Sequence, residues 1–263
     1  MRPTRISASS YLNTAPLVWS FLYGEQHGQV EIILDNAPAR SAELLAEDRV
    51  DAALVPVFAY QTIDRVKLIP DVCVGARERV QSVCLVTRDR ELERVRSVAL
   101  DRSSRTSVAL TKMIFREFFD DEPDWKIAEP DIEVMLTDAD CALLIGDPAL
   151  QLGGRSYKVF DLAELWRQFT GLGFVFAMWM TSRERSPLDF AAVRDEGLEH
   201  VEEIMNNYLP HVSLSRDEMR TYLTENISYS VDESMQKGME LYFELAQLHG
   251  LIAQNKPLQF TNG

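Results

Sequence analysis

The chain has 263 residues, of which 46% are hydrophobic, so it can bury a large core within one domain or two lobes. Its formal net charge of −14 at pH 7 argues against a nucleic-acid partner, because contacts with phosphate backbones need clustered lysine and arginine. Any anionic ligand must therefore be met by local hydrogen-bond donors.

The hydropathy of the chain indicates a cytoplasmic protein. No basic segment followed by an apolar one opens the sequence, and no stretch of about 18 uncharged apolar residues occurs in it. We therefore expect neither export nor a membrane partner. The oligomeric state stays open.

Apolar strand-like runs alternate with segments of helical periodicity up to residue 180. The runs cover residues 5–8, 30–34, 51–57, 80–87, 97–100, 141–146 and 174–180. Several are apolar throughout, as in strands that helices cover on both faces. The clearest helix in this part is predicted over residues 104–119. The alternation predicts an α/β fold.

The last third of the chain is predicted to be helical. Three amphipathic helices are expected, over residues 187–209, 215–225 and 231–251, with little strand between them. No internal repeat or long flexible linker separates them from the α/β part.

The domain organisation is predicted to be discontinuous, because no linker divides the chain into two consecutive domains. We expect two crossing segments, near residues 86–92 and 174–180. Lobe 1 then contains residues 1–88 and 178–263, and lobe 2 contains residues 89–177. Ligands of open α/β sheets bind beyond the carboxyl ends of the strands, so a cleft between the lobes is the expected site.

Polar side chains follow the first predicted strand and begin a later one. The loop "SSYLNT" offers Ser10, Tyr11 and Asn13 as hydrogen-bonding groups. Ser82 lies at the start of the strand over residues 80–87, and Pro56 ends another, so that its backbone could face the cleft.

The segment "LDRSSRTS" passes from a strand directly into a predicted helix. Ser104, Arg105, Thr106 and Ser107 lie where the unpaired backbone N–H groups of the first turn point outward. The helix dipole adds partial positive charge at the same place, so the segment is similar to an anion cradle. Arg105 could face a ligand or support the loop from outside.

Two glycine-bearing turns complete the set of loops. Gly146 and Asp147 follow the strand in "LLIGDPAL", and Gly171 and Phe174 lie in "FTGLGFVFA". Each loop also has an ordinary interpretation: Ser-Arg-Thr-Ser is often only a helix cap, Gly-Asp-Pro is a common turn, and Asn13 could cap a helix that begins nearby. Their shared position at strand ends favours a functional site.

Familiar catalytic motifs are missing from the sequence. We find no nucleophile elbow, Walker loop, His-Glu-x-x-His or Cys-x-x-Cys pattern, and we expect neither a metal nor a cofactor. The cysteines lie in apolar runs and are expected to be reduced core residues, and the histidines lie in a loop or in the C-terminal helices. These residues are Cys73, Cys84, Cys141, His27, His200, His211 and His249.

Taken together, "SYLNTAPL", "DAALVPV", "LDRSSRTSVAL", "LLIGDPAL" and "FTGLGFVFAMW" resemble, in order and spacing, the chorismate dehydratase family of the futalosine route to menaquinone. The resemblance covers residues 5 to about 180 closely. It implies a type 2 periplasmic-binding-protein fold, with two α/β lobes, a two-segment hinge and a cleft between the lobes. It also implies a cytoplasmic lyase that removes water from chorismate to give 3-[(1-carboxyvinyl)oxy]benzoate.

The resemblance also implies roles for individual residues. Asn13 and Ser82 are the expected catalytic groups, closest to the reacting atoms, and the helix start at residues 104–107 would bind a substrate carboxylate. The base could be the substrate's own enolpyruvyl carboxylate. Asp147 is the one cleft carboxylate considered as an acid or base, with a turn-stabilising role as the alternative.

Two alternative functions stay open at this point. The sister family on the same fold, 1,4-dihydroxy-6-naphthoate synthase, uses a catalytic histidine in the cleft, whereas no histidine lies between His27 and His200 here. A non-catalytic binding protein for a small carboxylate anion would also explain why the sequence contains few candidate catalytic residues. The sequence departs from the family pattern at residues 75–82 and at Gly173, where the family has proline, which affects only the expected loop geometry.

Overall fold

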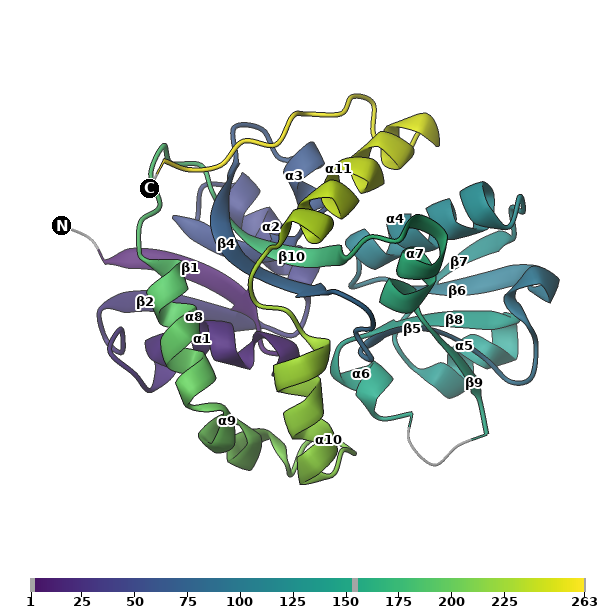
Figure 1. Ribbon diagram of the computed structural model, residues 1–263, viewed down its shortest axis with the longest axis horizontal. Coiled ribbons are helices and arrows are strands. Elements are labelled where there is room, and N and C mark those ends of the chain that lie inside the picture. Colours follow the sequence, from purple (N-terminus) through teal and green to yellow (C-terminus); the bar gives the residue numbers. More distant parts are fainter. Residues whose placement is uncertain (1–2, 153–155, 263) are drawn as a thin grey trace.

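The computed structural model describes residues 3–152 and 156–262, which form two five-stranded β-sheets lying next to each other (Figure 1). The first sheet has the order β2-β1-β3-β10-β4, and the second has the order β7-β6-β8-β5-β9. The strands of the first sheet are β1 (Thr4–Ser9), β2 (Val30–Asp35), β3 (Ala52–Pro56), β4 (Lys67–Ala76) and β10 (Phe174–Thr181). Those of the second are β5 (Val83–Thr87), β6 (Ser97–Asp101), β7 (Asp124–Ala128), β8 (Cys141–Ile145) and β9 (Lys158–Asp161).

Both sheets are built on the same plan. In the first sheet, β1 pairs in parallel with β2 and β3, and β10 lies antiparallel between β3 and β4. In the second sheet, β6 pairs in parallel with β7 and β8, and β5 lies antiparallel between β8 and β9. The inserted antiparallel strand is in each case the one that has just crossed from the other sheet. This arrangement confirms the predicted α/β fold with two crossing segments.

Helices cover both sheets (Figure 1). Those on the side of the first sheet are α1 (Ala15–Leu22), α2 (Pro38–Ala46), α3 (Ala59–Thr62), α8 (Phe190–Glu199), α9 (Val201–Tyr208), α10 (Arg216–Thr221) and α11 (Glu233–Leu248). Those around the second are α4 (Thr106–Met113), α5 (Ile132–Asp138), α6 (Asp147–Leu150) and α7 (Leu162–Thr170). Short 3₁₀ turns lie at Leu12–Thr14 and Leu92–Arg94, and π-helical segments at Ile114–Phe118 and Tyr222–Asn226 extend α4 and α10.

Most predicted elements are confirmed, with two kinds of difference. The helix expected over residues 104–119 is α4 with its π-helical extension, whereas the one expected over 187–209 is divided at His200 into α8 and α9. Strands β4, β7 and β9 were not predicted. β4 is hidden in the sequence by Pro70 and Asp71, of which Asp71 has φ +59° beside an irregular pairing with β10. β7 and β9 lie at sheet edges, where burial is too slight to leave an apolar run.

The first crossing lies earlier in the chain than predicted. The sequence predicts it near residues 86–92, within or after the strand of residues 80–87, but β5 already pairs with β8 and β9 in the second sheet. The chain therefore crosses at residues 77–82, and residues 83–88 belong with the second lobe rather than the first. Apolar runs show where strands lie but not with which sheet they pair, and this is why the boundary was displaced.

The return crossing is displaced in the same direction. We placed it at residues 174–180, but β10 pairs with β3 and β4 of the first sheet from its first residue, Phe174, to its last. The chain therefore returns at residues 171–173, and residues 174–177 belong with the first lobe.

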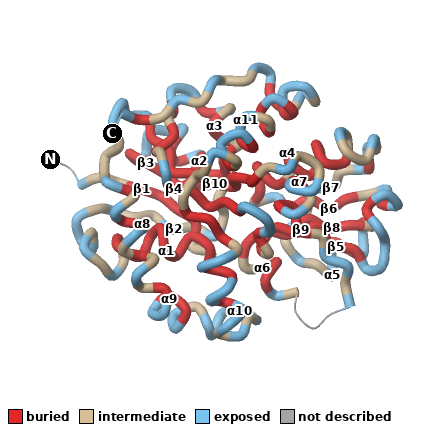
Figure 2. The backbone as a smooth tube through the Cα atoms, in the orientation of Figure 1, coloured by how far each residue is buried: buried red, intermediate tan, exposed pale blue. Residues whose placement is uncertain are grey.

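The core runs along the strands of both sheets (Figure 2). β3, β5 and β8 are buried at every residue, which explains why their sequences are apolar throughout. Cys73, Cys84 and Cys141 are free and buried, as predicted. In the described part of the chain, no helix has the length and apolar character needed to cross a membrane.

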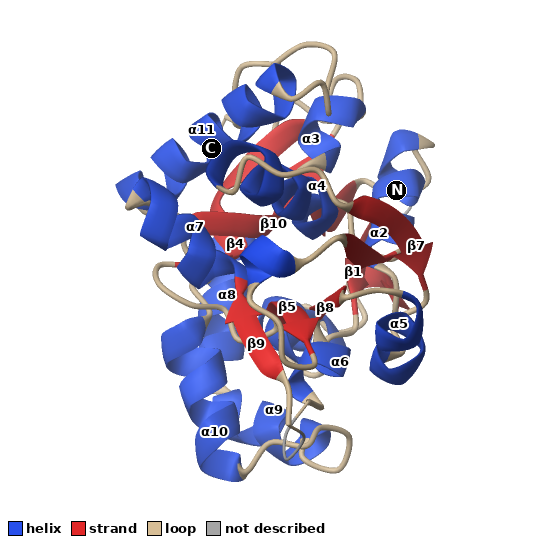
Figure 3. Cartoon of the chain, turned by 90° about the vertical axis from the view of Figure 1, so that its right-hand side faces the viewer, coloured by secondary structure: helices blue, strands red, loops and turns tan. Residues whose placement is uncertain are grey.

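The C-terminal helix α11 holds both crossing segments. Asp232, the residue before α11, pairs with Arg77 of the first crossing at 2.7 Å, and Ser234 Oγ accepts a hydrogen bond of 3.0 Å from the backbone N–H of Gly173 in the second. Figure 3 shows α11, α7 and β10 next to one another on this side of the molecule. At Gly238, an added Cβ would lie 2.0 Å from the Gly173 carbonyl oxygen, so only glycine lets α11 approach this closely.

We expect Gly238→Ala to destabilise the protein by about 1–3 kcal/mol, because overpacking against a backbone atom cannot be relieved by a side-chain rotation. Alanine's better helix propensity, about 1 kcal/mol, would have the opposite sign, so the sign of the measured change decides which effect dominates. Chemical denaturation measures the change. Gln236→Ala, at an exposed position of the same helix, is the control and should be nearly neutral. A Gly238→Ala variant as stable as this control would contradict the close packing.

Candidate functional site

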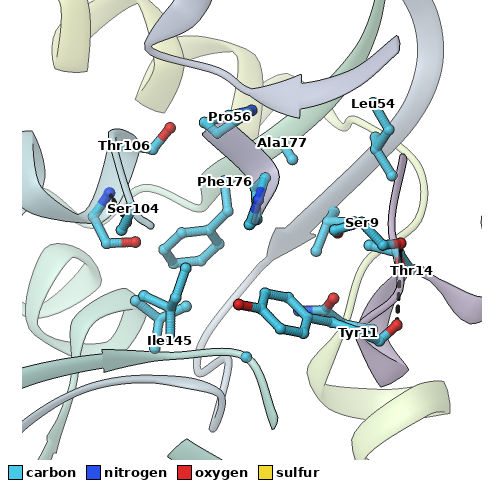
Figure 4. Close-up of a pocket in the computed structure, with 16 residues that line it drawn as sticks. Ser9, Tyr11, Thr14, Leu54, Pro56, Ser104, Thr106, Ile145, Phe176 and Ala177 are labelled. Atoms are coloured by element: carbon cyan, nitrogen blue, oxygen red, sulfur yellow. Dashed lines mark hydrogen bonds between the residues drawn. The ribbon is translucent and has the colours of Figure 1, made fainter. Parts of the chain in front are cut away.

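A cavity lies between the two sheets, where the carboxyl ends of β1, β3 and β8 meet the start of α4 (Figure 4). It has an empty volume of about 530 Å³, part of which is open to solvent, within the range typical of small-molecule sites. Both lobes contribute to its wall, as predicted for a cleft site. The wall contains Ser9, Tyr11, Asn13, Thr14, Pro38, Leu54, Pro56, Val74, Val83, Ser104, Thr106, Ser107, Ile145, Gly146, Phe176 and Ala177.

The loop after β1 is fixed by the hydroxyl group of Thr14. This group lies 2.6 Å from the Ser9 carbonyl oxygen and 2.8 Å from that of Tyr11, so its single hydrogen is shared between both acceptors and closes the loop. Leu12–Thr14 form a 3₁₀ turn, and α1 begins directly after it at Ala15. α1 has no side-chain cap, so Asn13 does not have the capping role that the sequence left open.

Asn13 is 8% exposed and lines the cavity, and its Oδ1 is buried without a hydrogen-bond partner in the described protein. An unpaired buried amide oxygen costs about 1–3 kcal/mol. Such a cost is tolerated where the group has another task, so Asn13 is a strong candidate for contact with a ligand.

Tyr11 lines the cavity (Figure 4), and its ring packs against Gly146. Burial raises the pKa of Tyr11 to about 12, although the nearby Ser103 hydroxyl lowers it. Asp101 and Asp147 raise it further through their negative charge. The phenol is therefore neutral at physiological pH and serves as a hydrogen-bond donor rather than a base.

The start of α4 offers several donors to the cavity. Ser104 Oγ accepts a hydrogen bond of 3.3 Å from the Ser107 N–H and so caps the helix, and Thr106 Oγ1 accepts one of 3.2 Å from the Phe58 N–H. Because both oxygens accept from the backbone, their hydroxyl hydrogens can point toward a ligand. The dipole of α4 favours an anion at the same place.

Arg105 lies outside this cradle. Its guanidinium group lies 3.9 Å from the carboxylate of Glu43 on α2, and it does not belong to the cavity wall. Of the two orientations that the sequence left open, the structure has the outer one. Binding of an anion here would depend on neutral donors and the helix dipole.

Ser82 lies directly behind the wall, next to Val83. It is fully buried, and its Oγ has no hydrogen-bond partner in the described protein. Its carbonyl accepts a hydrogen bond of 2.7 Å from the Gly146 N–H, and the preceding Gln81 has φ +64°, which is rare for a residue with a side chain. Asp161 holds this backbone, accepting from the Gln81 N–H at 2.6 Å.

Ser10 and Asp147, two of the predicted binding residues, bond to the protein outside the wall. The Ser10 hydroxyl donates to Asn36 Oδ1 at 2.6 Å. Asp147 Oδ1 accepts from the Leu12 N–H at 3.0 Å and thereby joins the two lobes, while burial raises the pKa of this carboxyl group and the Leu12 N–H lowers it. This contact is structural, but it joins the lobes and does not stabilise the turn of Asp147, which was the alternative that the sequence gave.

Gly171 and Phe174 also lie outside the wall. Gly171, with φ +74°, ends α7 in the left-handed conformation, which glycine adopts without strain. Phe174 packs in the core against Trp166 and Tyr242, and Phe176, two residues further along β10, lines the cavity instead. Their roles in substrate binding therefore have no support from the geometry.

The residues that the sequence missed are mostly apolar: Pro38, Leu54, Val74, Val83, Ile145, Phe176 and Ala177. Ile145 ends a strand that was predicted, so the strand-end rule could have found it, whereas Leu54 lies in the middle of β3. Val74 could not be found in this way, because β4 was not recognised.

The cavity has little charge in its wall. None of the wall residues, all within the described part of the chain, has an ionised side chain at neutral pH. Among the described residues, no three His, Cys, Asp or Glu side chains gather closely enough to hold a metal ion. The arrangement can bind and orient a partly apolar anion through hydroxyl, amide and backbone N–H donors.

Comparison with known proteins places the chain in a family. A family described as menaquinone biosynthesis matches residues 4–248. The chain belongs to this family. A curated family relative, chorismate dehydratase of Thermus thermophilus, is 30% identical over 267 residues, covering 93% of this chain and 95% of the relative. These findings confirm the resemblance that the sequence motifs indicated.

Solved structures share the fold of the chain. A protein from Archaeoglobus fulgidus has a TM-score of 0.76 at 16% identity, covering 94% of this chain and 98% of its own. The periplasmic aliphatic sulphonate binding protein of Escherichia coli has a TM-score of 0.64 at 14% identity, covering 100% and 95%. A Candida albicans protein described as having the generic periplasmic binding protein fold has a TM-score of 0.60 at 11% identity, covering 97% and 92%. The predicted periplasmic-binding-protein fold is thus confirmed.

We expect Gly146→Ala to destabilise the protein by about 1–3 kcal/mol, because a side chain at φ +63° and ψ −145° is strained. The added Cβ would also lie 2.7 Å from the Tyr11 ring and force it to move. Urea unfolding measures the loss. Gly171→Ala is the comparison: its φ is also positive, but with ψ 3° it lies in the left-handed helical region, which alanine adopts at lower cost, and no atom lies within 4 Å of an added Cβ. Its loss should be smaller, and equal losses in the two variants would contradict the additional strain and contact at Gly146.

Proposed function

We propose that this protein is a chorismate dehydratase, a lyase that converts chorismate to 3-[(1-carboxyvinyl)oxy]benzoate and water in menaquinone biosynthesis. The proposal rests on one observation above all: an uncharged cavity with a helix N-terminus and clustered hydroxyl groups, in a chain similar to a chorismate dehydratase along almost its whole length. We further propose that the enzyme acts in the cytoplasm.

The substrate suits this cavity. Chorismate carries two carboxylates, a ring hydroxyl and an enolpyruvyl ether. The donors of α4, supported by Ser104, Thr106 and Ser107, would bind one carboxylate, and the apolar wall with Phe176 would contact the ring. Because the whole protein is acidic, binding depends on these local dipoles rather than on the overall field.

The base in this mechanism comes from the substrate. Of the wall residues that the structure describes, none carries a carboxylate or imidazole, and Tyr11 is protonated at neutral pH. We propose that the enolpyruvyl carboxylate, held over the carbon that bears its ether, removes the proton there. The C–H electron pair becomes part of the ring π system, which delocalises it toward the ring carboxylate.

Loss of the ring hydroxyl then makes the ring aromatic. The C–O bond breaks with its electron pair, and the hydroxide takes the proton from the enolpyruvyl acid, so water leaves and the substrate carboxylate is restored. Asn13 and Ser82 would orient the departing hydroxyl, since both have unpaired polar atoms at this side of the cavity. Positioning and dipole stabilisation thus supply most of the catalysis.

The first test incubates the purified protein with chorismate and follows the products by chromatography with mass detection. A product lighter by one water supports the dehydratase. Unchanged chorismate that still protects the protein against thermal unfolding would indicate the binding protein instead. With neither effect, the proposed ligand is wrong.

Asn13→Ala should lower kcat on the order of 100-fold or more, because it removes a preorganised polar group from the reacting centre. The measurement is the rate of product formation at saturating chorismate. Asn207→Ala, at an exposed position of α9, is the control and should keep full activity. Full activity of Asn13→Ala as well would refute the role of the loop after β1.

Ser107→Ala should raise KM roughly tenfold with a smaller change in kcat, because a hydrogen bond to a carboxylate is lost in both ground and transition state. Steady-state kinetics with chorismate measure both constants. Thr111→Val is the control in the same helix, since the Thr111 hydroxyl is fully buried, unpaired in the described protein and outside the cavity wall. An unchanged KM in Ser107→Ala would exclude the start of α4 as the carboxylate site.

The positions of the histidines bear on the alternative sister enzyme. His200 stacks on Trp19 and pairs with Glu203, and His249 pairs with Glu117 in the π-helical extension of α4. His27 and His211 are exposed in loops. None of these four described residues belongs to the cavity wall, so a mechanism that needs a histidine in the cleft finds no support here.

A further inference from the structure

Tyr222 lies behind the cavity wall, although it comes from the C-terminal helical part of the chain. It opens the π-helical segment after α10, which lies between α9 and α6 at the lower edge of the molecule in Figure 1. The side chain is fully buried, and its hydroxyl has no hydrogen-bond partner in the described protein. Nothing in the sequence singled it out.

The Tyr222 hydroxyl lies next to both predicted catalytic residues. Glu218, one turn before Tyr222, lines a groove together with Gln81 and Cys84, so this segment packs against the strand start that contains Ser82. Burial raises the pKa of Tyr222 far above its usual range, while the side chains of Ser82 and Asn13 each lower it, in keeping with this placement. Neither contact has the geometry of a formed hydrogen bond. Three buried polar groups from distant parts of the chain thus meet at one point without pairing.

These three groups have complementary chemistry. The buried atom of the Asn13 amide is its oxygen, an acceptor, whereas the phenol and the Ser82 hydroxyl can each donate. A small rotation would let Tyr222 donate to Asn13 Oδ1 and accept from Ser82. The Asn13 amide would then present its N–H groups to the cavity. Unpaired polar groups are costly in a core, so their concentration beside the cavity points to a function.

We propose that Tyr222 is a positioning residue, which donates its hydroxyl hydrogen to Asn13 Oδ1 and so directs the Asn13 amide and the Ser82 hydroxyl toward the departing hydroxyl of the substrate. Tyr222 does not belong to the cavity wall and therefore acts through these two residues. This inference rests on the proposed dehydratase function.

Tyr222→Phe removes only the hydroxyl and keeps the buried ring. We expect kcat to fall roughly 10- to 100-fold, the equivalent of one hydrogen bond to a polar centre, with little change in KM because the carboxylate site at α4 is untouched. Steady-state kinetics with chorismate separate the two constants, and thermal unfolding confirms that the variant is folded.

Tyr229→Phe is the matched control. Tyr229 is also a buried tyrosine whose hydroxyl is unpaired in the described protein, but its pKa is raised by burial first, and neither Asn13 nor Ser82 is among the groups that affect it. We expect this variant to keep its kcat. A second comparison places Tyr222→Phe in an Asn13→Ala background, where it should cause less than a twofold further loss, because a positioning residue has no effect once its target is absent.

The outcomes separate this inference from the function on which it rests. If the unsubstituted protein does not dehydrate chorismate, the proposed function fails, and the inference falls with it. If the unsubstituted protein is active and Tyr222→Phe keeps its kcat, only the inference is overturned. An equal loss of kcat in Tyr229→Phe, or an undiminished loss in the Asn13→Ala background, would also overturn it, because either result indicates a general effect of buried hydroxyl groups.

Discussion

The buried carboxylate of Asp161 is the interaction on which the rest of the site depends. It accepts hydrogen bonds from the Val80 and Gln81 N–H groups in the first crossing segment, and from the Ala163 N–H in the first turn of α7. Since α7 leads to the second crossing, one side chain couples the two passages of the chain between the lobes. It also holds Gln81 in its left-handed conformation and thereby sets the direction of the following Ser82.

The wall of the cavity is uncharged although the protein as a whole is strongly acidic. The chain has a net charge of −14, yet the wall contains hydroxyl, amide and apolar groups, and Arg105 at the start of α4 faces Glu43. A site of fixed dipoles needs no counter-ion to reorganise when charge moves within the substrate. Such a site suits a reaction in which the substrate supplies its own carboxylate and the protein supplies geometry.

The sequence predicted the polar half of the site and missed most of the rest. Asn13, Ser104, Thr106 and Ser107 were found because hydroxyl and amide groups at strand ends are unusual without a task, and all four line the cavity. Most of the apolar wall carries no local signal that separates it from the core, and neither does Tyr222, because a buried aromatic residue in a helix is usually a core residue. The crossings were misplaced for a related reason: strand pairing is a long-range property that local hydropathy does not encode. The role of each site residue in catalysis stays a prediction.

Two contacts described above join the lobes at the cleft: the Leu12 N–H with Asp147, and the Phe58 N–H with Thr106. Each pairs a backbone N–H of the first lobe with a side-chain oxygen of the second. The loop after β1 and the start of α4, which carry the donors of the site, are therefore each tied directly to the opposite lobe. A change in the angle between the lobes would stretch these bonds, so the spacing of the donors is coupled to the position of the lobes.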